Sequence, residues 1–229
     1  MFCVAATVRW RISRFARCAG ACLLLLATVL VWQLPVLAAA ARPDFLASVP
    51  PTVRGSVEQV SVTGLAPGVR VALLDASGTA VAAATVDDFG SYLFRRVPPG
   101  EGYTVVAETG GGAPLELGPV TVMSPDTPPD ASLFEQTLTP GYGYLQVRDG
   151  TLLAYQLLLP DPAVWGTGPY PVVIDYSGYE PSYRIYDGLD QAFLNLGYAV
   201  MGVNMRGTAC SGGAFDYFEW LQALDGYDI

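Results

Sequence analysis

Apolar and polar residues alternate in short runs along residues 52–123. Alternation with a period of two is typical of β-strands that bury one face, and clusters of Gly, Pro and Asp separate the runs. Several such runs at a spacing of about 8–12 residues predict an antiparallel β-sandwich. The expected strands cover residues 57–62, 69–73, 81–86, 92–97, 103–107 and 115–123.

The pattern changes in residues 142–229, where longer apolar runs appear. Asp149-Gly150 lies between two apolar runs, which is a strong β-hairpin signal. Continuous apolar runs at 171–176 and 198–204 are typical of buried strands. A helical spacing of apolar residues lies between them, with Asp187 as the expected helix cap. A second helical face begins at Phe218. A hairpin followed by strand, helix, strand and helix predicts an α/β sheet with parallel strands.

A proline-rich segment at residues 124–141 separates these two patterns. Proline removes backbone donors and disfavours helix in the residue before it, so this segment is predicted to be a linker. Tyrosine use also differs, because residues 142–229 contain 11 of the 13 tyrosines. We therefore expect one domain at 52–123 and a second at 142–229.

The amino-terminal residues 1–41 have the composition of a secretory signal peptide. Four arginines precede an apolar run at 22–34, and a stretch of alanines follows, with cleavage predicted after Ala38, Ala40 or Ala41. An uncleaved anchor helix over 19–41 is the alternative. Gln33 and Pro35 interrupt the apolar run, which favours cleavage and a secreted or extracytoplasmic protein. Contact with a membrane is expected only through this segment.

Composition excludes several classes of function. The chain is 52% hydrophobic and carries a net charge of −9, with no Lys. The first property argues against a disordered chain, and the second argues against nucleic-acid binding, which requires clustered basic residues. Three of the four cysteines lie in the signal segment, so Cys210 has no partner for an internal disulfide.

The chain contains no His. A Ser-His-Asp triad or a His metal site therefore cannot be completed within these residues, and no metal or cofactor is expected. Asp87 and Asp88 could suggest calcium, but no third carboxylate lies at ligand spacing. A turn before Gly90 is the favoured interpretation.

Two resemblances extend these inferences. The pattern from Asp87 to Val105 (D-x-x-G-x-Y-x-F…V-P-P-G…Y-x-V) resembles transthyretin-like modules found beside carboxypeptidases. In residues 142–229, the motifs RDGTLL, YPVV, GYAV…RG…SGGxF and DGYDI occur in order. Together they resemble the start of the X-Pro dipeptidyl-peptidase (S15) and cocaine-esterase-like (CocE/NonD) family of hydrolases. The resemblance implies a β-sandwich followed by the truncated start of an α/β-hydrolase fold.

The family resemblance also implies roles for particular residues. Its members use a Tyr hydroxyl after the first buried strand as an oxyanion donor, and the matching residue here is Tyr179. The nucleophile elbow G-x-S-x-G, the acid and the His base are absent from this chain. Ser211 is expected to be a turn residue, because no His can take its proton. Arg206 is expected to be structural and to pair with an acid near the loop.

Together with the signal segment, the resemblance implies an exported serine hydrolase that acts on a peptide, ester or amide. The 229-residue chain is expected to be a fragment that is inactive by itself. The alternative is a secreted, non-catalytic binding or adhesion protein, since abundant Tyr and few charges suit recognition surfaces.

Overall fold

The computed structural model describes residues 49–108, 110–179 and 186–229, so the predicted signal segment lies outside the described residues. The regular structure of the described residues is mainly β-strand, arranged in three sheets with few helices. Among them, no helix combines the length and apolar character needed to cross a bilayer.

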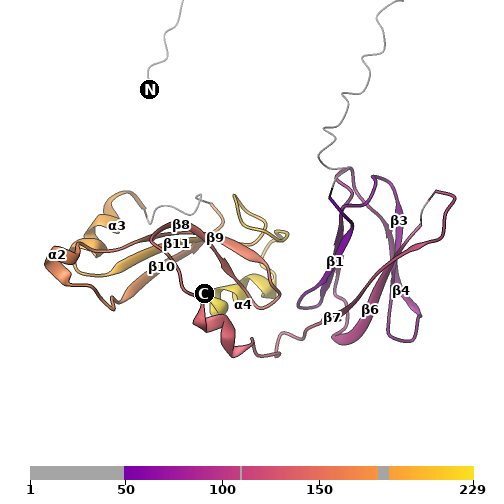
Figure 1. Ribbon diagram of the computed structural model, residues 1–229, viewed down its shortest axis with the longest axis horizontal. Coiled ribbons are helices and arrows are strands. Elements are labelled where there is room, and N and C mark those ends of the chain that lie inside the picture. The colour runs from indigo at the N-terminus through magenta and orange to yellow at the C-terminus, as the bar shows by residue number, and fades with distance from the viewer. Residues whose placement is uncertain (1–48, 109, 180–185) are drawn as a thin grey trace, which may run out of the picture. The chain divides into compact units, whose positions relative to one another are not determined.

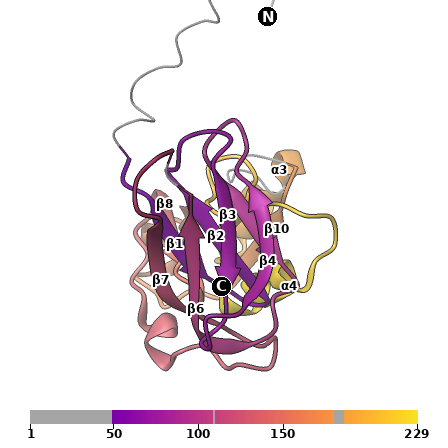
Figure 2. The same cartoon turned by 90° about the vertical axis from the view of Figure 1, so that its right-hand side faces the viewer.

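Two antiparallel sheets form the first half of the described chain (Figure 1). One has the order β1-β2-β5 and consists of β1 (Thr52–Gly55), β2 (Gln59–Thr63) and β5 (Tyr92–Arg95). The other has the order β4-β3-β6-β7 and consists of β4 (Ala80–Thr85), β3 (Arg70–Leu74), β6 (Gly100–Ala107) and β7 (Leu115–Val122). Figure 2 shows the strands of the second sheet side by side.

The inward faces of these two sheets share one apolar core. Their alternating residues supply it, as the sequence pattern requires. The buried members are Val60, Val62, Val71, Leu73, Val86, Phe94, Val97, Tyr103, Val105, Ala107 and Val122. Five of the six expected strands overlap β3 to β7, and the expected strand 57–62 begins at Gln59. Strand β1 was not expected.

The turn at Asp87 has the structure that its sequence predicted. The Asp87 side chain accepts hydrogen bonds from the backbone N–H groups of Phe89 and Ser91, both at 2.9 Å. Gly90 has a φ of +73°, and a Cβ there would meet the Leu65 carbonyl oxygen at 1.8 Å. Asp87 therefore serves as a turn residue, and only glycine fits at position 90.

The expected linker contains local structure of its own. Asp130 caps a 3-10 helix, η3 (Ala131–Glu135), by accepting a hydrogen bond from the Ser132 N–H at 2.9 Å. The Thr127 carbonyl oxygen accepts a hydrogen bond from Arg148 at 3.0 Å. The segment between the two halves is thus anchored to the third sheet.

The third sheet has the order β10-β11-β9-β8. Its strands are β8 (Gly141–Gln146), β9 (Leu152–Leu158), β10 (Val172–Ser177) and β11 (Ala199–Asn204). β8 and β9 form the predicted hairpin, and β10 and β11 pair in parallel, as the strand–helix–strand order predicted. β11 is buried along its whole length because it lies between β9 and β10.

The described residues of this half form three α-helices, which are α2 (Pro162–Trp165), α3 (Tyr186–Asn195) and α4 (Trp220–Asp228). Helix α2 was not expected. The last helix begins two residues later than its apolar pattern predicted, because Phe218 has a φ of +56° and cannot belong to a right-handed helix. The expected helix cap at Asp187 is also wrong, since α3 already begins at Tyr186.

Candidate functional site

The carboxyl ends of β10 and β11 meet at one edge of the third sheet. Ser177 and Asn204, the last residues of the two strands, are register partners. The Met205 N–H donates to the Ser177 carbonyl oxygen at 3.0 Å, so the loops that follow begin side by side. In open α/β sheets, ligands bind outside the carboxyl ends of the strands. This edge is therefore the candidate position of a functional site.

Tyr179, the expected oxyanion donor, lies two residues beyond β10 at this edge. Its N–H donates to the Ser177 hydroxyl at 3.2 Å, and its side chain is 94% exposed. Residues 180–185, which follow it, lie outside the described residues. The position is compatible with the expected role, and the role itself stays a prediction.

The Ser211 hydroxyl donates one hydrogen bond to the backbone and accepts another from it. It donates to the Asn204 carbonyl oxygen at 2.8 Å and accepts from the Ala154 N–H at 2.9 Å. These bonds tie the loop after β11 to strand β9. The hydroxyl that could have suggested a nucleophile thus occupies a structural position, which agrees with its assignment as a turn residue.

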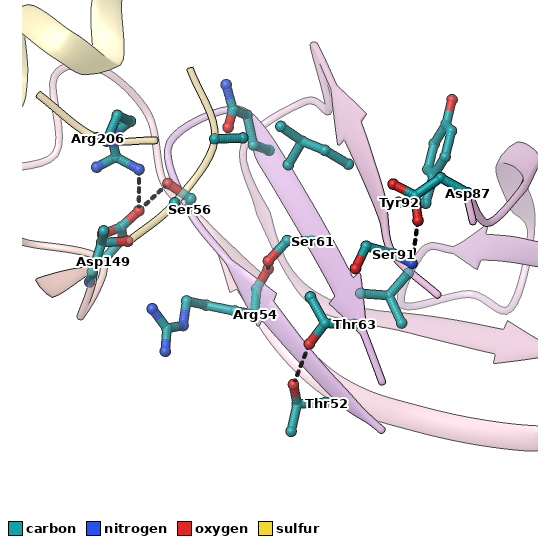
Figure 3. Close-up of a pocket in the computed structure, with 16 residues that line it drawn as sticks. Thr52, Arg54, Ser56, Ser61, Thr63, Asp87, Ser91, Tyr92, Asp149 and Arg206 are labelled. Carbon is teal, nitrogen blue, oxygen red and sulfur yellow. Dashed lines mark hydrogen bonds and ion pairs between the residues drawn. The ribbon is translucent and has the colours of Figure 1, made fainter. Parts of the chain in front are cut away.

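Arg206, two residues beyond β11, is the centre of a buried ionic network, and Figure 3 shows its contact with Asp149. It binds the two oxygens of Asp225, on helix α4, at 2.6 and 2.5 Å. A third contact, at 3.0 Å, joins it to Asp149 in the hairpin turn. Asp149 also accepts a hydrogen bond from the Ser56 hydroxyl at 2.5 Å. The expected structural role of Arg206 is confirmed by this pairing.

A second ion pair lies next to the first. Arg148 contacts both oxygens of Asp228 through its guanidinium, with a shortest distance of 2.7 Å. The cluster thus contains three carboxylates, those of Asp149, Asp225 and Asp228, and two guanidinium groups. All five side chains are almost completely buried. One negative charge in the cluster is therefore uncompensated.

Burial and the neighbouring charges shift the pKa values of these groups in different directions. Burial raises the pKa of Asp225 to about 6, against the favourable contacts with Arg206. For Asp149, burial is outweighed by the charge and hydrogen bond of Arg206 and by the Ser56 hydrogen bond, so its pKa is lowered. Burial and the charge of Asp225 raise the pKa of the Tyr176 hydroxyl.

A groove of about 460 Å³, lined mainly by polar residues, lies between the outer face of the β1-β2-β5 sheet and the loops of the third sheet (Figure 3). Ser56, Asp149 and Arg206 form part of its wall. Most of its other polar lining residues carry hydroxyl groups: Thr52, Ser61, Thr63, Ser91, Tyr92 and Thr151. Neither the groove nor the rest of the described chain groups three or more Cys, Asp or Glu residues so that they could hold a metal ion.

Sequence reasoning found Arg206 but not its partners. Asp225 lies on a helix 19 residues further along the chain, and Ser56 is 93 residues from Asp149. The only local signal was that an arginine at a buried strand end needs a carboxylate. Nothing in the sequence identified which carboxylate it would be.

Comparison with known proteins gives one family match. Residues 149–229 match the model of the X-Pro dipeptidyl-peptidase family (S15). The match begins at Asp149 rather than at Tyr142, where the motif resemblance began. The match covers less than half of the chain. It supports similarity to a family of hydrolases and nothing more specific.

The other comparisons add little. A solved structure described as "Biofilm associated protein - BSP domain" has 21% identity and a TM-score of 0.29. It covers 34% of this chain, which spans only 14% of that protein. Likeness at this level supports no argument about fold, and curated proteins gave no match. The transthyretin-like resemblance of residues 52–123 has no support here, whereas residues 149–229 resemble a family of hydrolases.

Proposed function

We propose that this protein supplies part of an exported serine hydrolase of the X-Pro dipeptidyl-peptidase or cocaine-esterase-like type, which cleaves a peptide, ester or amide bond. The observation that carries the proposal is the family match over residues 149–229. The parallel pair β10 and β11, with Tyr179 beyond the carboxyl end of β10, is compatible with it. In this proposal, Tyr179 donates a hydrogen bond to the oxyanion of the tetrahedral intermediate.

The 229 residues alone are proposed to be inactive. A serine nucleophile needs a base, and the sequence contains neither His nor Lys. Ser211 already uses its hydroxyl to bind two backbone groups. Loss of triad members lowers the rate by about 10⁴–10⁶-fold, so an oxyanion donor by itself leaves almost no catalysis.

The first experiment measures hydrolysis of nitrophenyl esters and X-Pro anilides by the purified chain, together with labelling by a fluorophosphonate probe. We expect neither turnover nor labelling. Turnover that disappears in Ser211→Ala would show that this serine is a nucleophile after all.

The second experiment tests Tyr179 in a longer protein that includes a G-x-S-x-G elbow downstream of these residues. Tyr179→Phe should lower kcat by about 10²–10³-fold, the usual cost of one oxyanion donor. Tyr142→Phe is the matched control, because Tyr142 is an exposed tyrosine on β8, at the opposite edge of the sheet. Equal effects of the two variants would contradict the assignment.

A binding or adhesion protein is the second candidate. Large exposed aromatic side chains lie in the loop between β11 and α4 and at the first residue of α4, and such residues are enriched in recognition surfaces. They are Phe215, Tyr217, Phe218 and Trp220. The reading frame beyond Ile229 distinguishes the candidates, since a continuing frame with G-x-S-x-G favours the hydrolase.

A further inference from the structure

The loop between β11 and α4 contacts the outer face of the β1-β2-β5 sheet through Glu219. One oxygen of Glu219, Oε2, accepts a hydrogen bond from Arg95 Nη1 at 2.7 Å and another from Gln59 Nε2 at 2.8 Å. Gln59 and Arg95 are register partners on β2 and β5, so their side chains share one face of the sheet. Two neighbouring strands of the first half thus hold a single carboxylate of the second.

Arg95 makes further contacts with the same loop. Its Nη1 lies 3.2 Å from Asp216 Oδ2, and its Nη2 donates to the Phe215 carbonyl oxygen at 3.5 Å. The Arg95 side chain is 32% exposed and that of Glu219 is 15% exposed, so solvent only partly screens the pair. One guanidinium therefore binds three residues of the segment 215–219.

The backbone of this loop has an unusual conformation. Phe218, next to Glu219, has a φ of +56°, which is rare for a bulky residue. A Cβ on Gly207 would lie 2.1 Å from the Phe215 nitrogen, so the loop folds back tightly on itself. Backbone conformations of this kind persist only where surrounding contacts hold them. The contacts with Arg95 and Gln59 are placed to do so.

The beginning of the loop is also joined to the first half. Arg206 binds Asp149, and Asp149 accepts the hydrogen bond from Ser56 (Figure 3). Ser56 lies directly after β1. The segment 206–219 is therefore tied at both ends to residues of the β1-β2-β5 sheet or its adjoining turn.

We propose that Arg95, assisted by Gln59, is a positioning residue that fixes the loop 207–219 at the carboxyl end of β11. The β1-β2-β5 sheet would then be a docking surface for this loop and not only a neighbouring domain. The proposal stands on these contacts and does not require the hydrolase function. Within that function, it means that residues of the first half set the shape of the site edge.

Limited proteolysis of the full chain with chymotrypsin tests this, because the loop presents Phe215, Tyr217 and Phe218 as cleavage sites and Trp220 follows it as the first residue of α4. Cleavage of a folded loop follows the population of its open form. We expect Arg95→Gln to raise the rate of cleavage at residues 215–220 by about three- to tenfold, measured by mass spectrometry. Cleavage at Tyr142 and Tyr144 on β8 should not change.

Arg70→Gln is the matched control, because Arg70 is an exposed arginine on β3, in the other sheet of the first half. Glu219→Gln changes the other partner of the Arg95–Glu219 contact and should also raise loop cleavage. The double variant Arg95→Gln/Glu219→Gln should be cleaved less rapidly than the product of the two single effects predicts.

Three results would overturn the proposal. One is unchanged loop cleavage in both single variants, and another is an equal rise in Arg70→Gln. The third is a rise in cleavage spread evenly over the loop and β8, since Arg95 would then stabilise the protein as a whole and not the loop.

Discussion

The buried charge cluster is the most demanding feature among the individual residues. Removing a charge from water costs several kcal/mol, and only close partners offset that cost. Arg206 meets the condition through Asp225 and Asp149, and Arg148 meets it through Asp228. These residues join α4, the hairpin turn and the end of β11. Their loss should therefore affect the stability of the whole third sheet.

Replacing Arg206 by Met tests this directly. The change leaves Asp149 and Asp225 buried without their cation, so it should destabilise the protein by about 3–5 kcal/mol. Urea unfolding followed by circular dichroism gives the free energy of unfolding. Arg54→Met, at an exposed arginine, should change it by less than about 0.5 kcal/mol. A loss of under 1 kcal/mol in Arg206→Met would mean that the cluster contributes little.

Asp225 should make the stability depend on pH. Its pKa rises from 3.8 to about 6 on folding, so the folded state binds this proton more tightly than the unfolded state does. The resulting stabilisation is complete below about pH 4, falls as the pH rises to 6 and is absent above it. The rise corresponds to about 3 kcal/mol at most.

The measurement compares wild type with Asp225→Asn in urea between pH 4.5 and 7.5. The stability of wild type relative to the variant should decrease with rising pH and level off above about pH 6.5. A difference that stays constant over this range would show that Asp225 is ionised throughout. The window avoids Asp149, whose lowered pKa acts in the opposite direction at lower pH.

The strands differ in how well their apolar residues are covered. The first two sheets bury their apolar faces against each other in one core. The third sheet leaves its edge strand β10 with Val172 and Ile174 exposed, and β8 exposes Tyr142 and Tyr144. An apolar edge strand with unpaired backbone groups is a template for association.

Separate fragments should therefore behave differently. Residues 52–123 should fold alone and melt cooperatively, because their core is complete. Residues 142–229 should aggregate or bind a hydrophobic dye, because their apolar edges and helix faces lack cover. Thermal melts and dye fluorescence of the two fragments provide the comparison. A soluble, cooperatively melting 142–229 fragment would contradict the truncated-hydrolase interpretation.

For the molecule as a whole, the sequence predicts export. The arginine-rich start, the apolar run and the alanines of residues 1–41 predict processing by a signal peptidase. Mass analysis of secreted protein should show a new amino terminus between Ala39 and Arg42. Protein that retains Met1 on membranes would favour an anchor instead.

Residue patterns alone determined the position of most strands in this protein. Alternation with a period of two located β3 to β7, and continuous apolar runs located β10 and β11. A strand buried on one face has alternating apolar residues, and a strand buried on both faces has a continuous apolar run. The hairpin followed from Asp149-Gly150. The motifs beyond it indicated the hydrolase family, and the composition excluded a His base.

Only the tertiary structure decided how these elements meet. Strand β1 is short and pairs only at the edge of its sheet, so its pattern gave no signal. Phe218 adopts a positive φ beside the contacts of Glu219, which no helical periodicity could reveal. The pairs Ser56 with Asp149 and Arg95 with Glu219 join residues 93 and 124 positions apart. Such contacts depend on how the chain closes on itself, and local periodicity holds no information about that closure.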